Sequence, residues 1–146
     1  MPKHLTSHVV IDAPPEAVWA VLRDFAAYSE WNPFIVEAVE DGERLTLRMQ
    51  PAGGRPVTLR PRVADCVADK RLQWRGRLAI PGILDAEHTF ELEAHGNGTR
   101  LTQKERFSGL LVPLFARSLD QHTLPAFVAM NEALKTRAEA RAPARV

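Results

Sequence analysis

The most constraining feature of this sequence is its long central segment, from Ile35 to Phe107, in which apolar and polar residues tend to alternate. Alternation with a period of two is typical of half-buried strands. Turn residues divide the segment at Asp41-Gly42, Gly53-Gly54, Pro81-Gly82 and Gly96-Asn97-Gly98. The segment therefore predicts a meander of six antiparallel strands, expected at residues 34–40, 44–50, 57–67, 71–78, 85–93 and 99–107.

The segments on either side complete the predicted architecture. Residues Leu5–Ile11 predict a further strand, so the sheet has seven strands and is wide enough to curl around a helix. Two prolines after Asp12 predict the start of a helix to about Phe25, followed by one helical turn before Asn32-Pro33. Helical spacing then predicts one long C-terminal helix, bent at Pro125, with an apolar stripe of Phe115, Leu119, Thr123, Phe127, Met130 and Leu134.

Composition narrows the class of protein. The 146 residues fit one domain, residues 1–146, with a flexible tail from about residue 139. A net charge of +1 makes nucleic acid an unsuitable partner. The only cysteine, Cys66, excludes an internal disulfide and favours a reducing, cytoplasmic setting. No leader pattern and no apolar run long enough to span a membrane is present, and oligomeric state is not predicted.

The order of one strand, two short helices, six strands and a long helix is the α+β helix-grip plan. With VIDAPPEAVWAVLRDFAAYSEWNPF, RLQWRGRL, EHTFELE and ERFSGLLVPLF, the chain resembles the START-like (SRPBCC) superfamily and, within it, the polyketide cyclase/dehydrase-like branch. The resemblance covers nearly the whole chain. It implies a seven-stranded curved antiparallel sheet wrapped around the long helix, with a pocket between them. Members include lipid carriers, receptors, quinone-binding proteins and aromatase/cyclases, so fold alone does not name an activity.

Strand alternation predicts which side chains face this pocket. In RLQWRGRL, Leu72, Trp74, Gly76 and Leu78 lie on one face, and Gln73, Arg75 and Arg77 lie on the other. The apolar set is expected to face the pocket. By the same rule, the inward residues of the next two strands are Ala86, His88, Phe90, Leu92, Leu101, Gln103, Glu105 and Phe107.

A histidine and a carboxylate are expected to meet on this inner face. If the turn at HGNG keeps inward residues opposite one another, His88 pairs with Glu105 and Phe90 pairs with Gln103. A nearby carboxylate favours the imidazolium, whereas burial disfavours either charge alone, so the pair is expected to titrate together near neutral pH. Three interpretations stay open: a pair that fixes sheet register or holds water, polar anchors for a ligand, or an acid/base pair.

The predicted ligand-binding residues combine the inner face of the sheet with the inner stripe of the long helix. Trp31 is added as a support or a mouth residue, and His122 either leans into the pocket or is solvated. No histidine spacing supports a metal site, and no cofactor is expected. The predicted set is Trp31, Leu47, Met49, Leu59, Trp74, His88, Phe90, Gln103, Glu105, Phe107, Phe115, Leu119, His122, Phe127 and Met130.

The leading functional hypothesis is binding or transport of a small hydrophobic molecule such as a lipid, a quinone, an aromatic or a polyketide-like compound. An apolar cavity with a few polar groups suits such a ligand. One alternative is a cofactor-independent aromatase/cyclase in which His88 and Glu105 move protons. A second alternative is a protein-interaction module, which an exposed apolar patch outside the pocket would favour.

Overall fold

The computed structural model of the protein describes residues 2–51, 53–78 and 82–141. The strands are β1 (Lys3–Ile11), β2 (Ile35–Asp41), β3 (Arg44–Met49), β4 (Val57–Leu59), β5 (Arg62–Val67), β6 (Arg71–Leu78), β7 (Leu84–His95) and β8 (Gly98–Ser108). The helical segments are α1 (Pro15–Arg23), η1 (Phe25–Ala27), α2 (Tyr28–Trp31), α3 (Val112–Ser118), η2 (Leu119–Thr123) and α4 (Leu124–Arg141).

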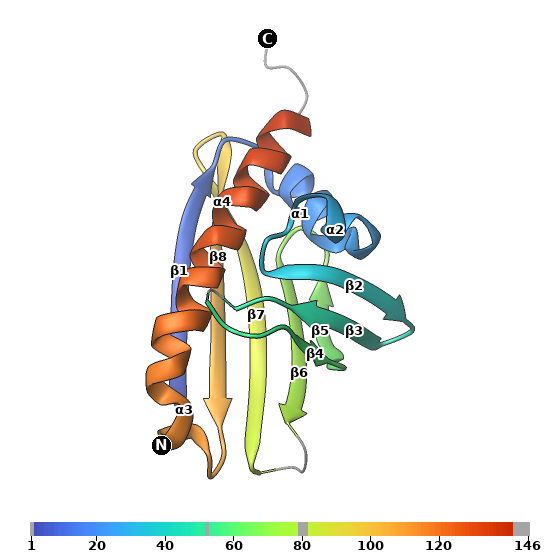
Figure 1. Cartoon of the computed structure of the whole chain (residues 1–146). Coiled ribbons are helices and arrows are strands. Elements are labelled where there is room, and N and C mark those ends of the chain that lie inside the picture. Colours follow the sequence, from blue (N-terminus) through green and yellow to red (C-terminus); the bar gives the residue numbers. More distant parts are fainter. Residues whose placement is uncertain (1, 52, 79–81, 142–146) are drawn as a thin grey trace.

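The strands form one antiparallel sheet in the order β1-β8-β7-β6-β5-β3-β2, with β4 paired to β3. The sheet curls, and α4 lies across its concave face against β1 and β8 (Figure 1). The short helices α1 and α2 lie at one end of the sheet, beside the C-terminal half of α4 (Figure 1). The predicted helix-grip plan is therefore confirmed.

The predicted strand at residues 57–67 is divided into β4 and β5. Pro61 lies at the division, where it has no N–H to donate to a strand ladder. Its carbonyl accepts a hydrogen bond of 2.9 Å from the N–H of Leu45. β5 then pairs with β6 from Arg62, opposite Arg75, onward. Counted separately, the two pieces give eight strands, and residues 76–78 of β6 have no strand partner on this side among the described residues.

The long C-terminal helix contains an irregular turn one turn ahead of its internal proline. In a regular helix, Pro125 would lack a hydrogen bond and its ring would crowd the carbonyl of Gln121. Just before the proline, the N–H of Leu124 donates to the carbonyl of Leu119, which lies five residues earlier. A regular α-helix would pair it with the residue four earlier, so η2 is a π turn. The irregularity predicted at Pro125 thus takes the form of a widened turn between α3 and α4.

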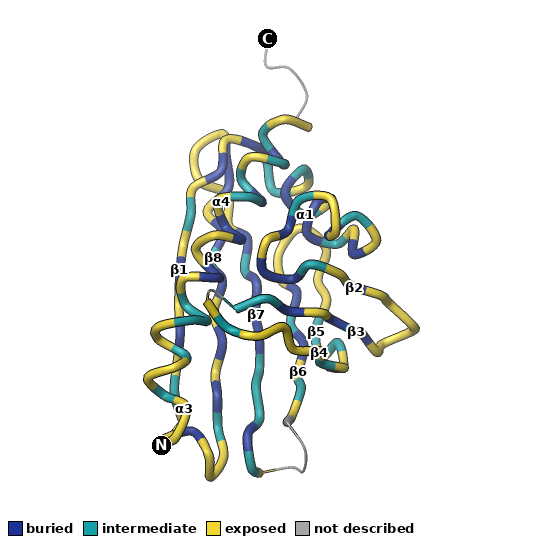
Figure 2. Tube along the Cα trace, in the orientation of Figure 1, coloured by how far each residue is buried: buried dark blue, intermediate teal, exposed yellow. Residues whose placement is uncertain are grey.

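The hydrophobic core is concentrated where α1 and α4 cover the sheet. Phe127, Met130 and Leu134 of α4 are fully buried in it. The turn before α3 and the start of α3, in contrast, leave Leu110 and Leu114 exposed by 79% and 74% (Figure 2). The helix therefore packs tightly near its C-terminal end and only loosely over the other end of the sheet.

The corner predicted at Asn32-Pro33 is held by the Asn32 side chain. Its Oδ1 accepts hydrogen bonds of 2.9 and 2.8 Å from the N–H groups of Phe34 and Ile35. Just before this corner, the buried Tyr28 hydroxyl donates to the carbonyl of Leu22, and burial raises the pKa of Tyr28 well above its usual value. These contacts fix Phe34 where it can face the interior.

Glu139 connects the end of α4 to the turn after β1 by a hydrogen bond. Its carboxylate accepts hydrogen bonds of 2.6 Å from Lys135 Nζ and 2.8 Å from the N–H of Asp12. Of the tail expected from about residue 139, the residues up to Arg141 continue α4, and residues 142–146 lie outside the described residues.

We expect Glu139→Gln to lower stability at neutral pH by less than about 1 kcal/mol, because the ion pair lies at the surface and its carboxylate is partly exposed. The hydrogen bond from Lys135, followed by that from Asp12, lowers the pKa of Glu139 below its usual 4.5 in the folded state. A lowered carboxyl pKa stabilises the fold above the unfolded-state pKa, and this contribution is lost as pH falls through the folded-state pKa. Denaturant unfolding of both proteins should therefore converge below about pH 4. Glu132→Gln, an exposed change on the same helix, is the control; a pH-independent difference for Glu139→Gln would contradict the assignment.

Candidate ligand cavity

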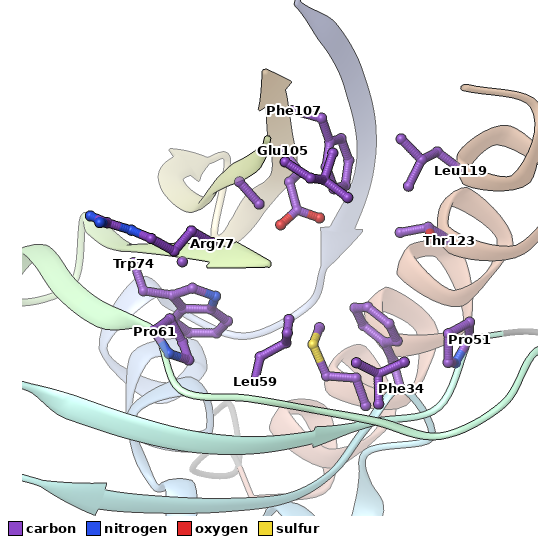
Figure 3. A pocket seen from close by; sticks show the side chains of 15 residues that line it. Phe34, Pro51, Leu59, Pro61, Trp74, Arg77, Glu105, Phe107, Leu119 and Thr123 are labelled. Carbon is purple, nitrogen blue, oxygen red and sulfur yellow. The ribbon is translucent and has the colours of Figure 1, made fainter. Parts of the chain in front are cut away.

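An apolar cavity of about 180 Å³ lies at the loosely covered end of the sheet, between the sheet, the β3–β4 region and η2. Its walls are almost entirely hydrophobic, and Glu105 supplies the carboxylate among them (Figure 3). The lining residues are Phe34, Met49, Pro51, Val57, Leu59, Pro61, Trp74, Gly76, Arg77, Leu84, Ala86, Glu105, Phe107, Leu119 and Thr123.

The register of the sheet determines which side chains of β6, β7 and β8 line the cavity. Trp74 pairs with His88 and His88 pairs with Glu105, in one row across β6, β7 and β8. The neighbouring row sets Gly76 and Ala86 opposite each other, and their small size leaves space above the backbone. The predicted register across the HGNG turn is thus confirmed.

The opposite wall comes from the first half of the chain and from the π turn. Phe34 follows the Asn32 corner, and Leu59 points inward from β4 (Figure 3). Met49 of β3 also lines the cavity. Leu119 and Thr123 project from η2. Because η2 has no buried residue, this side of the cavity is the more loosely packed one.

Glu105 is the acidic residue of the cavity lining. Its carboxylate points into the cavity (Figure 3), and the residue is only 7% exposed. Oε2 lies 3.3 Å from Nδ1 of the fully buried His88, although the geometry of this contact is not that of a good hydrogen bond. Oε1 is then left to meet a ligand.

His88 belongs to a chain of buried polar side chains whose direction can be derived. Asn131 Nδ2 donates to Ser7 Oγ, and Gln103 Nε2 donates to Asn131 Oδ1, both at 2.8 Å. Gln103 Oε1 is therefore the acceptor for His88 Nε2, at 2.9 Å, and Nε2 carries a hydrogen. Nδ1 therefore faces Glu105 and makes no hydrogen bond to a described residue.

Aromatic rings separate His88 from the cavity. Its ring stacks on Trp74, with centroids 5.1 Å apart, and meets Phe90 and Phe127 at 4.7 and 5.0 Å. A molecule in the cavity can therefore touch Glu105 directly but reaches His88 only through Glu105. In this arrangement, His88 lies behind the carboxylate.

The structure brings six of the predicted binding residues to the cavity and leaves nine outside its lining. The six are Met49, Leu59, Trp74, Glu105, Phe107 and Leu119. Of the other nine, Leu47, His88, Phe90, Gln103, Phe127 and Met130 are buried in the packing behind it, Trp31 packs on Tyr28, His122 lies beside Gly53, and Phe115 is 37% exposed on α3. The inner stripe of the helix thus fills the core more than it lines the cavity.

Sequence reasoning missed several residues of the site. Asn131 follows Phe127 by four residues, so its place on the inner face of the helix was readable from the helical period. Ser7 alternates with Leu5 on β1 and was readable from the strand period. Thr123 was on the predicted inner stripe of the helix but was not counted as a binding residue. Pro51, Val57 and Pro61 gave no such signal.

Within the described ranges, no group of three or more His, Cys, Asp or Glu residues is arranged to hold a metal ion. None of the helices in the described part of the chain is long and apolar enough to cross a membrane.

The curled sheet, the long helix across its concave face and the apolar cavity between them define a helix-grip protein. A family model described as polyketide cyclase/dehydrase and lipid transport matches residues 2–139. The chain therefore belongs to this family. No curated protein sequence matches the chain.

Solved structures share the fold over nearly the whole chain. The Zhui aromatase/cyclase from Streptomyces sp. R1128 has a TM-score of 0.78 at 22% identity, covering 97% of this chain and 96% of that one. The protein TTHA0849 from Thermus thermophilus has a TM-score of 0.77 at 15% identity, covering 97% of this chain and 100% of that one. The di-domain ARO/CYC StfQ from the steffimycin biosynthetic pathway has a TM-score of 0.78 at 10% identity, covering 97% of this chain and 52% of that one. At these identities, the likeness concerns the fold alone.

Proposed function

We propose that the protein binds a small, mostly apolar molecule in the cavity and that Glu105 accepts a hydrogen bond from a hydroxyl group of that molecule. The family and its aromatase/cyclase neighbours support a hydrophobic ligand-binding or cyclase role. The observation that carries the proposal is the single carboxylate pointing into an otherwise apolar cavity (Figure 3).

The volume of the cavity limits the size of the ligand that it can hold. An apolar cavity of about 150 Å³ in another protein is known to bind benzene. At about 180 Å³, this cavity suits a guest of one ring to two fused rings. A long folded polyketide chain would need further opening, for which the loosely packed η2 side is the favourable place. Small aromatic alcohols are therefore suitable probes.

We expect 2-naphthol to bind with quenching of Trp74 fluorescence, and Glu105→Gln to weaken this binding by about fivefold, since a neutral acceptor replaces a charged one. Naphthalene, which lacks the hydroxyl, should bind both proteins within about twofold of each other. Glu93→Gln, on the exposed face of β7, is the matched control. Equal weakening of both ligands by Glu105→Gln would contradict the proposed hydrogen bond.

We expect Ala86→Leu to abolish binding of both probes without lowering the unfolding temperature, because the added methyl groups fill open space in the cavity. Isothermal titration calorimetry and thermal unfolding measure the two effects. If this variant binds both probes as tightly as the unchanged protein does, the cavity is not the binding site.

A cyclase-type enzyme is the second candidate, and the closeness of His88 Nδ1 to the Glu105 carboxylate, 3.3 Å, favours it. Such a pair can take a proton from carbon next to a ketone if the carbon lies within reach of Glu105. Deuterium uptake into 2-tetralone in heavy water, followed by NMR, tests this activity directly. Exchange that Glu105→Gln abolishes would support the enzyme; exchange no faster than in buffer would exclude it for such ketones.

A further inference from the structure

The cavity is flanked by two arginine triplets that the proposed function does not use. Arg60-Pro61-Arg62 lies between β4 and β5, and Arg75-Gly76-Arg77 lies on β6. The middle residue of each triplet lines the cavity. Pro61 and Gly76 approach closely, since a Cβ on Gly76 would lie 3.3 Å from the Pro61 Cβ. The two triplets thus face each other where β6 loses its strand partner.

Strand geometry directs the four guanidinium groups away from the cavity. Arg62 pairs with Arg75, and continuing this register by two residues sets Arg60 against Arg77. Alternation places these side chains on the face opposite Pro61 and Gly76. Figure 3 shows the stem of Arg77 at the cavity with its guanidinium pointing outward. We call these four residues the arginine rim.

The arginine rim is incompletely neutralised. Arg75 binds Glu87 at 2.8 Å, whereas Arg60, Arg62 and Arg77 make no ion pair with any described residue. Arg44 pairs with Arg62 on its other side, so three arginines stand directly opposite one another across β3, β5 and β6. Like charges in this arrangement are destabilising. An arrangement that costs stability in the free protein is expected where an anion binds.

The outer surface next to the rim carries a groove that shares residues with the cavity lining. A polar groove lined by Arg75, Arg77, Arg106 and Ser108, together with the carboxylates Asp85 and Glu87, shares Gly76, Arg77 and Ala86 with the cavity lining. Asp85 is engaged by the N–H of Gly82 at 3.1 Å. A ligand that leaves the cavity past the free edge of β6 would therefore meet guanidinium groups immediately.

We propose that the ligand is an amphiphile whose apolar part occupies the cavity and whose anionic group, a phosphate, sulfate or carboxylate, is held outside by the arginine rim. Guanidinium groups bind such oxyanions through paired, charge-assisted hydrogen bonds. This inference rests on the proposed function, because it extends the same cavity to the class of its ligand.

The test compares two probes with the same rings, 2-naphthol and 6-hydroxy-2-naphthyl phosphate, by titration calorimetry. The second probe keeps a hydroxyl for Glu105 and carries its phosphate on the opposite end of the ring system. We expect Arg62→Gln and Arg77→Gln each to weaken binding of the phosphate by roughly tenfold and to leave 2-naphthol within about twofold. Added salt should weaken only the phosphate. Arg62→Gln should leave the unfolding temperature unchanged or raised, since it removes a like charge. Arg100→Gln, an exposed arginine near the other end of β8, is the control.

The possible results separate this inference from the proposed function. In the first result, Arg62→Gln and Arg77→Gln bind the phosphate as tightly as the unchanged protein does, while 2-naphthol still binds and Ala86→Leu still blocks its binding. This result would overturn the anionic ligand and keep the cavity as the binding site. Binding of both probes that Ala86→Leu does not reduce would overturn the proposed function. Phosphate binding that depends on the rim but survives Ala86→Leu would overturn the two-part ligand, because the anion would then bind without the cavity.

Discussion

Replacing His88 by leucine is expected to destabilise the protein by about 3 kcal/mol, because it leaves the Glu105 carboxylate without a partner in a nearly dry environment. His88 is the only basic group within ion-pair distance of Glu105 among the residues described. The change also removes the hydrogen bond to Gln103 and the stacking on Trp74. Denaturant unfolding at neutral pH measures the loss.

A double-mutant cycle distinguishes loss of the pair from loss of packing. Glu105→Leu alone leaves His88 Nδ1 facing an apolar group and is expected to cost about 1–3 kcal/mol. The double variant His88→Leu/Glu105→Leu removes both partners and is expected to be more stable than His88→Leu alone. Additive losses would contradict a direct interaction between His88 and Glu105, since independent side chains show no coupling.

Replacing Gly98 by alanine is expected to cost about 3 kcal/mol, because the new Cβ has no space. At this position, the β7–β8 turn meets the end of β1, and a Cβ would lie 2.3 Å from the Ile11 carbonyl oxygen. The backbone cannot yield without disturbing the β1–β8 register, in which Ile11 pairs with Thr99. Thermal and denaturant unfolding measure the effect.

Gly42→Ala is the matched control for this prediction. Gly42 has a φ of +61°, yet nothing lies within 4 Å of its Cβ position, so only the left-handed backbone is strained. A loss of about 1 kcal/mol is expected there. Equal losses at both glycines would show that backbone conformation, and not the contact with Ile11, decides the outcome at Gly98.

The inner face of the sheet was predictable because its period is simple and its turns are short. Once HGNG was recognised as a tight turn, the pairing of His88 with Glu105 followed from counting residues. The row continues to Trp74 by the same rule. Local sequence therefore contained both the fold and the central polar pair.

The boundary between cavity and core was not predictable in the same way. Phe127 and Met130 have the right helical spacing, but they lie where the helix packs tightly on the sheet and fill the space themselves. Whether an inward residue lines a cavity depends on its distance from the facing element, which periodicity does not contain. The π turn ahead of Pro125 and the break at Pro61 decide that distance here.

The site combines an acidic residue inside apolar walls with basic residues outside those walls. Glu105 offers an acceptor within apolar walls, and the buried chain from Ser7 to His88 sets the direction in which the protons point. The arginine rim lies outside the same walls. A ligand that satisfies both would be apolar in the middle and polar at two ends.

The most direct test of the central claim is a crystal structure of the protein with 2-naphthol. The account predicts the two rings between Trp74 and Leu119, with the hydroxyl oxygen within hydrogen-bond distance of Glu105. Rings bound at the exposed leucines of α3, or a cavity closed by protein side chains while the ligand binds elsewhere, would contradict it.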